Sequence, residues 1–112
     1  MSIATLTSNM ANRFAPLTLP DVLHKLPRYY SQRLKTFRGD KDYTDDEYIM
    51  CFNDLIDLEE VDHDDANMRL FTQSLAREVK KWFRALTTRS INDFPAFKTT
   101  FIARWEDKRN SL

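Results

Sequence analysis

The chain has 112 residues, a length that suits one domain with a buried core. Its single Gly argues against tight β-hairpin turns and against a Gly-rich phosphate loop, because both need glycine at defined positions. Its net charge of zero argues against a general nucleic-acid binder, which carries a clear basic excess.

The neutral total hides three blocks of charge. Residues 1–39 carry a net charge of +5, residues 40–65 carry −11, and residues 66–112 carry +6. Acidic and basic side chains are therefore expected on different surfaces of the folded protein.

Cysteine use and hydropathy indicate the compartment. Cys51 is the only cysteine, so no disulfide can form within the chain, and a reducing compartment is the default. No apolar run reaches the roughly 20 residues of a membrane span, and the N-terminus lacks the pattern of a signal peptide. These features predict a soluble, intracellular protein with no membrane partner.

The first forty residues show little helical periodicity. Residues 1–12 are rich in Ser, Thr and Asn without an apolar period, which predicts a flexible tail. Residues 21–26 lie between two prolines and can form one or two helical turns with Val22, Leu23 and Leu26 facing inward. Gly39 then predicts a turn with a positive φ.

The segment that begins at Thr44 is a strong helix candidate. Thr44 and Glu47 have the spacing of a capping box, and the acids between them suit the positive end of the helix dipole. Apolar residues then recur on one side at helical spacing: Tyr48, Ile49, Phe52, Leu55 and Ile56. This pattern predicts an amphipathic helix whose apolar side faces the core.

Three further helices are predicted after it. The acidic stretch 59–65 opens a second helix, with Asp62 or Asp64 as its N-cap. A third helix is predicted from about Ser74 and a fourth from about Asn92. The predicted fold is therefore all-α, a compact bundle of four to five helices.

The aromatic residues from Trp82 to Trp105 all fall on the apolar sides of predicted helices. Nucleic-acid bases stack on aromatic side chains that are exposed, whereas these are predicted to be buried. The predicted core comprises Phe37, Phe52, Leu70, Phe71, Leu75, Val79, Trp82, Phe83, Leu86, Phe97, Phe101 and Trp105.

The sequence predicts no catalytic, metal or cofactor site. The stretch 59–65 lacks the Gly and the ligand spacing of a calcium loop, and His24 and His63 have no partner at zinc spacing. Both histidines are interpreted as surface residues, and Cys51 as an inert, partly buried thiol. The chain is therefore not expected to be an enzyme.

The basic stripe on the predicted third helix is the strongest candidate for a binding surface in the sequence. Its residues fall within about 100° of one another on the side opposite the apolar residues. They are Arg77, Lys80, Lys81 and Arg84. A solvated face, a contact with an acidic protein surface and a contact with a polyanion all fit this stripe.

Three stretches carry a family resemblance in order along the chain: "LPRYYSQRLKTFRGD", "MRLFTQSLAREVKKWFRAL" and "SINDFPAFKTTFIARWEDKRN". Together they resemble the Gag polyprotein of plant gypsy-class LTR retrotransposons over about residues 13–110. The matching positions are Phe37, Gly39, Arg69 to Phe71, Ser74, Leu75, Trp82, Phe83, Ser90, Ile91, Phe101, Arg104 and Trp105. Phe94 departs from the family pattern, which often has Trp or Leu there, but it keeps the apolar role.

The resemblance implies an all-α capsid domain that self-assembles into a shell around the element's RNA. A full Gag continues into a second capsid lobe and often a Cys/His zinc knuckle, which a chain with one Cys lacks. The expectation is therefore an N-terminal capsid lobe, or the product of a gene derived from one. It implies a cytoplasmic location, with virus-like particles, or a nuclear one if the gene is domesticated.

The charge blocks suggest how copies of the chain would meet. The basic stripe would form one side, and the other would be Asp54, Asp57, Glu59 and Glu60. Unlike patches give head-to-tail contacts that close into rings or extend into lattices. The same charges could instead neutralise one another within the fold.

Two other functions stay open. One is an adaptor, derived from Gag, that binds a peptide or a partner helix. The other is a module that binds RNA directly through its basic residues. For the isolated neutral chain, RNA binding is expected to be weak and without sequence preference.

Overall fold

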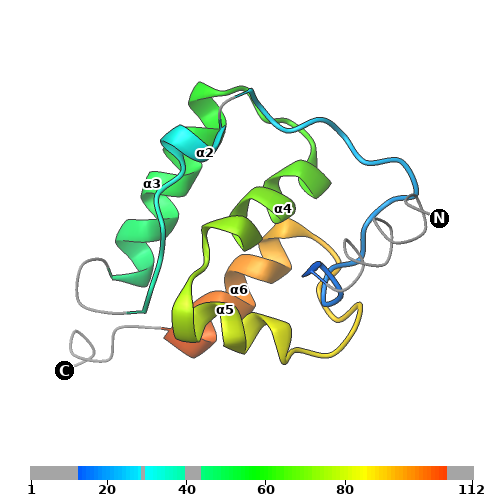
Figure 1. Ribbon diagram of the computed structural model, residues 1–112, viewed down its shortest axis with the longest axis vertical. Coiled ribbons are helices and arrows are strands. Elements are labelled where there is room, and N and C mark those ends of the chain that lie inside the picture. Colours follow the sequence, from blue (N-terminus) through cyan, green and yellow to red (C-terminus); the bar gives the residue numbers. More distant parts are fainter. Residues whose placement is uncertain (1–12, 29, 40–43, 106–112) are drawn as a thin grey trace.

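The computed structural model describes residues 13–28, 30–39 and 44–105, and this part of the chain is all-α, as predicted. Its helices are α2 (Tyr30–Arg33), α3 (Asp45–Leu58), α4 (Asp64–Ser74), α5 (Arg77–Arg84) and α6 (Phe94–Trp105). Figure 1 shows α4 in the middle, with α3 along one side and α5 at the lower end. α6 packs against both α3 and α4. The predicted tail, residues 1–12, and residues 106–110 of the expected domain lie outside the described residues.

The predicted capping box starts α3. The Thr44 hydroxyl accepts a hydrogen bond from the Glu47 amide at 3.1 Å, and it also donates to the Glu47 carboxylate at 3.1 Å. Tyr48 and Phe52 on the apolar side are buried, and Ile49, Leu55 and Ile56 are partly buried. The apolar period predicted this helix and its orientation correctly.

α4 is the central helix, and all but two of its eleven residues are buried. The prediction that Asp62 or Asp64 caps it is wrong, because His63 occupies the N-cap position and makes no side-chain cap bond. The Asp64 carboxylate instead accepts a hydrogen bond from the Phe94 amide at 2.9 Å. Asp64 thus satisfies a free amide at the start of α6, a distant partner that local spacing does not reveal.

The predicted start of the third helix at Ser74 is also wrong. Ser74 ends α4, and Leu75 takes an extended conformation with ψ 140°. The extended segment forms a β-bridge with Phe37, in which the Phe37 amide donates to the Ser74 carbonyl at 2.8 Å. α5 then begins at Arg77, whose φ of 53° lies in the left-handed region. Pairing of Leu75 with Phe37 therefore moves the start of the third helix from Ser74 to Arg77.

A second β-bridge, between Leu17 and Ile91, fixes the N-terminal segment. The Thr18 amide donates to the Ile91 carbonyl at 2.8 Å, and the Ile91 amide donates to the Pro16 carbonyl at 2.9 Å. Leu17 and Ile91 are both buried. Residues 13–19 are therefore held against the loop between α5 and α6.

Residues 21–26 are not helical, contrary to the prediction, and Val22 is 80% exposed rather than inward-facing. A segment of six residues between two prolines is too short to repay the cost of helix nucleation. Leu26 still packs against the core as part of an irregular segment.

The core is a cluster of aromatic rings centred on Phe71 of α4. Phe71 has no exposed surface, and its ring centroid lies 4.9–5.7 Å from those of five other aromatic residues. These residues are Tyr48, Phe52, Phe94, Phe97 and Phe101. One ring thereby joins α3, α4 and α6.

Nine of the twelve predicted core residues are buried, and Trp82, Leu86 and Trp105 are only partly buried. The two Trp rings meet edge to face, with 6.2 Å between centroids. Trp82 lies in the last turn of α5, and Trp105 is the last residue of α6. The expectation that Trp82, Leu86 and Trp105 belong to the core is thus corrected: they are partly buried and pack against it.

The Phe71 cluster gives a first prediction. Phe71→Ala should lower the free energy of unfolding by about 3–5 kcal/mol, since it removes a ring from a closely packed site. Trp82→Ala should cost less, because part of its ring already contacts water. Urea unfolding followed by circular dichroism measures both. The account of the core would be refuted by a Trp82→Ala variant that is as destabilised as Phe71→Ala.

Gly39 gives a second prediction. Its φ of 79° confirms the predicted turn, and a Cβ at this position would lie 2.9 Å from Trp105 Cζ3 and 3.0 Å from Val79 Cγ2. Gly39→Ala should therefore cost more than about 1 kcal/mol, from backbone strain and crowding together. Thr36→Ala, at an exposed site three residues earlier, is the control and should unfold like the wild type. Equal stability of the two variants would contradict this reasoning.

Candidate functional site

α5 presents the predicted basic stripe to solvent. Val79 and Phe83 on its inner side are buried. The four basic residues of the stripe, hereafter the basic face, are all exposed: Arg77, Lys80, Lys81 and Arg84. Glu78 is the only acid on the helix, and its Oε1 lies 3.4 Å from Lys81 Nζ in an exposed pair that contributes little. The basic face therefore keeps most of its positive charge.

The predicted acidic side lies at the C-terminal end of α3 and just beyond it. Asp54, Asp57 and Glu60 are exposed, and these three residues are hereafter the acidic face. Glu59 differs, because its side chain is only 17% exposed and forms an ion pair with Arg33 of α2. Neutralisation within the fold thus removes one of the four predicted acidic residues from the surface set.

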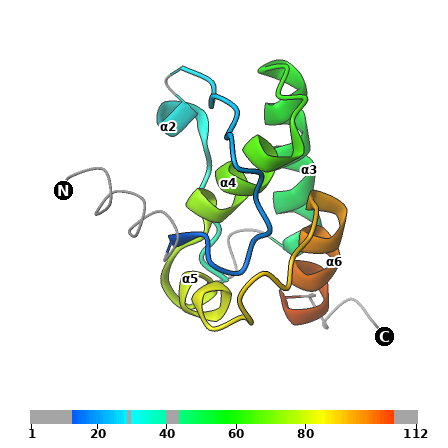
Figure 2. The same cartoon turned by 90° about the vertical axis from the view of Figure 1, so that its right-hand side faces the viewer.

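The two faces lie at opposite ends of the molecule. In Figures 1 and 2 the C-terminal end of α3 lies near the top of the molecule, and α5 lies near the bottom. None of the ion pairs found among the described residues joins α3 to α5. Contact between the two faces therefore needs two copies of the chain, or a different partner for each face.

The structure brings together two histidines that lie 39 positions apart in the sequence. The rings of His24 and His63 stack with 3.5 Å between their centroids. His24 also holds Asp65, with its amide 3.0 Å from Oδ2 and its Nδ1 2.6 Å from Oδ1. Both histidines are exposed, as predicted, but this cluster could not be predicted from local spacing, because its members come from separate segments.

Asp65 links this cluster to the buried α4. Its side chain is 5% exposed, and its Oδ2 lies 2.9 Å from Nη2 of Arg69, one turn further along the helix. Arg69 also donates to the His24 carbonyl. Desolvation acts to raise the pKa of Asp65, but hydrogen bonds from the His24 amide, the His24 ring and Arg69 outweigh it and lower that pKa. Asp65 therefore fastens the segment around His24 onto α4.

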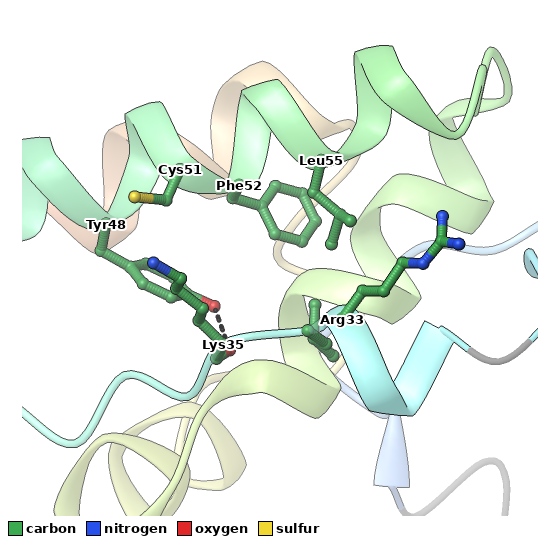
Figure 3. A pocket seen from close by; sticks show the side chains of 7 residues that line it. Arg33, Lys35, Tyr48, Cys51, Phe52 and Leu55 are labelled. Carbon is green, nitrogen blue, oxygen red and sulfur yellow. Dashed lines mark hydrogen bonds between the residues drawn. The ribbon is translucent and has the colours of Figure 1, made fainter.

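A groove lies between α3 and the segment that follows α2 (Figure 3). Its walls are Arg33, Leu34, Lys35, Tyr48, Cys51, Phe52 and Leu55. Tyr48 donates from its hydroxyl to the Lys35 carbonyl at 3.4 Å, and burial raises the pKa of this hydroxyl, against a smaller opposing effect of a hydrogen bond with Ser74. Cys51 is a free, partly buried thiol on this wall, and no histidine lines the groove to act as its base.

Across the described ranges, no three His, Cys, Asp or Glu side chains are grouped so that they could hold a metal ion. Likewise, none of the described helices combines the length and apolar character needed to cross a membrane.

Comparisons of the chain with protein-family models, with curated proteins and with solved structures gave no match. The assignment of a function therefore depends on the residues of the chain itself and on their arrangement.

The Asp65 cluster gives a third prediction. Asp65→Asn should lower the free energy of unfolding by about 1–3 kcal/mol at pH 7, since it weakens hydrogen bonds to a charged group. Because the folded pKa is lowered, this stabilisation is present above the unfolded pKa of about 3.9 and is lost as pH falls through the folded pKa. The difference between wild type and variant should therefore shrink in acid.

Urea unfolding between pH 2.5 and pH 7 measures this difference. Asp62→Asn, which changes an exposed acid beside the cluster, is the matched control and should stay close to the wild type at each pH. A difference for Asp65→Asn that is constant across this range would show that the lost stability is not due to the charge of Asp65.

Proposed function

We propose that this protein is a structural, non-catalytic capsid domain, a Gag-type N-terminal lobe of an LTR retrotransposon or of a gene derived from one. The support from the sequence is the ordered series of motifs from Phe37 to Trp105. In the structure, the apolar members of this series are buried or pack against the core. The proposed setting is the cytoplasm, in virus-like particles, or the nucleus for a domesticated gene.

One observation carries the proposed mode of assembly, namely two exposed faces of opposite charge on different helices. The basic face lies on α5 and the acidic face at the end of α3. Because the faces differ and lie at opposite ends of the molecule, a contact between them is heterologous and leaves one free face on each copy. Repetition of such a contact produces a ring or a lattice, which a shell requires.

Individual contacts of this type are weak. An exposed ion pair contributes about 0–1 kcal/mol, so one copy binds another weakly, and stability comes from many contacts at once. The isolated chain is therefore proposed to be monomeric in dilute solution and to associate with itself at high concentration.

The groove of Figure 3 favours a second candidate function, an adaptor that binds a partner helix. Leu34, Phe52 and Leu55 give it an apolar lining, and Leu58, one turn beyond Leu55 on α3, is 73% exposed. An apolar contact of this kind differs from the charged one in its response to salt, because salt screens charges and does not weaken hydrophobic burial.

Charge reversal tests the assembly directly. Lys81→Glu with Arg84→Glu should weaken self-association by about fivefold or more, as about 1 kcal/mol of attraction becomes repulsion. Asp54→Lys with Asp57→Lys should have the same effect, and a mixture of the two double variants should associate again. Sedimentation of each protein alone and of the mixture, at low and high salt, measures this.

The control is Lys25→Glu with Arg38→Glu, which changes the net charge equally at two exposed residues outside α3 and α5. It should associate like the wild type. The charged contact would be ruled out if both basic double variants behaved alike, or if the mixture failed to associate. Association that strengthens with salt would point to the groove and to the adaptor instead.

A further inference from the structure

A cavity opens beside α5, where the N-terminal segment crosses the C-terminal part of α4. It has a volume of about 490 Å³, including its open mouth, and its walls are Arg13, Thr72, Gln73, Lys80, Phe83 and Arg84. Three of these six side chains are cationic, and the lining contains no acidic side chain. The cavity therefore separates the basic face into two halves, because Lys80 and Arg84 line it and Arg77 and Lys81 do not.

The three cations have no ion-pair partner among the described residues. Other basic side chains do have one, since Arg33 pairs with Glu59 and Arg69 pairs with Asp65. Glu78, the acid nearest in sequence to Lys80, is paired with Lys81 outside the cavity. Like charges that share one concave wall repel one another, and a bound anion would relieve that repulsion.

The neutral residues of the wall suit an anion as well. Phe83 is buried and stacks on Phe97 with 5.4 Å between centroids, which gives the cavity a fixed floor. Gln73 accepts a hydrogen bond from the Tyr30 hydroxyl at its Oε1, at 2.5 Å. Its amide nitrogen is thereby left as the group that can donate to a ligand.

The position of the cationic side chains on α5 determines which groups can contribute to anion binding. Lys80 lies in the middle of α5 and Arg84 lies one turn later at its C-terminal end, where the helix dipole disfavours an anion. The backbone therefore gives no help, and binding must come from the side chains. This makes the site sensitive to the removal of those side chains in particular.

We propose that this cavity binds a compact polyanion of the phosphate class, a phosphate monoester or a pyrophosphate group. Arg13 and Arg84 each offer two parallel N–H donors that match a pair of phosphate oxygens, and Lys80 adds a point charge. The cavity gathers three cations around one small volume, which fits the two or more negative charges of such a group better than the single charge of a phosphodiester. The site goes beyond the proposed assembly, because it is complete within one copy of the chain.

The test uses the dilute monomer in a buffer free of phosphate, with sodium pyrophosphate as the probe and sodium chloride at equal ionic strength as the reference. Isothermal titration calorimetry should show saturable binding at one site per chain. Lys80→Gln with Arg84→Gln should weaken it by about tenfold or more, and Arg13→Gln by about threefold to tenfold, as charge-assisted hydrogen bonds are lost.

The matched control is Arg77→Gln with Lys81→Gln, which removes the same charge from the same helix outside the cavity. It should change the affinity for pyrophosphate by less than about twofold, as expected for distant charges screened by salt. Equal weakening by the two double variants would overturn the proposal in favour of a general electrostatic effect. An absence of saturable binding by the wild type would overturn it too.

A single-stranded oligouridylate provides the last arm, since it offers phosphodiesters without a terminal phosphate group. The proposal expects it to bind more weakly than pyrophosphate, and with equal sensitivity to the two double variants. Tighter binding of the oligonucleotide that depends on Lys80 and Arg84 would instead identify RNA as the ligand and refute the compact polyanion. Because the dilute protein is used throughout, failure of this site leaves the assembly proposal intact, and the converse also holds.

Discussion

The burial of Phe71 in the middle of α4 is the constraint on which the arrangement of the helices depends. Five rings from α3 and α6 surround it at 4.9–5.7 Å between centroids, so the positions of α3, α4 and α6 are fixed relative to one another. Aromatic contacts of this kind add about 0.5–1.5 kcal/mol each to the burial of apolar surface. With α3 and α6 fixed in this way, the outer side of α3 is the side that carries the acidic face.

A helix buried on nearly all sides needs internal partners for its polar side chains. α4 supplies most of them within itself: Arg69 pairs with Asp65, Thr72 donates to the Met68 carbonyl at 2.9 Å, and Ser74 donates to the Phe71 carbonyl at 2.6 Å. Other bonds of α4 join it to distant segments: Asp65 accepts from the His24 amide, and Asp64 accepts from the first amide of α6. The polar residues of α4 thus hold the segment around His24 in place, although this segment belongs to no helix.

Sequence reasoning worked where the determining interactions are local. The Thr44–Glu47 capping box, the apolar side of α3 and the positive φ of Gly39 depend on residues within a few positions of each other, and all three are found in the structure. It failed where a distant segment decides. Leu75 pairs with Phe37 and is therefore not helical, and Asp64 accepts a hydrogen bond from the first amide of α6, 30 residues away. Arg13 meets Lys80 and Arg84 at one cavity for the same reason, so the basic face could be predicted and the cavity within it could not.

The charge blocks of the sequence acquire a physical meaning once internal pairing is removed. Glu59 and Asp65 form ion pairs within the fold, whereas Asp54, Asp57 and Glu60 stay exposed at the C-terminal end of α3 and just beyond it. On the basic side, Lys80 and Arg84 serve both the proposed contact and the proposed anion site, whereas Arg77 and Lys81 serve the contact alone. Two ligands that share side chains must oppose each other, and by linkage each weakens the other by the same factor. A bound polyanion would then reduce the attraction between copies, and assembly would expel the anion. Under these two proposals, the concentration of phosphate-class anions would set the concentration at which copies of the chain associate.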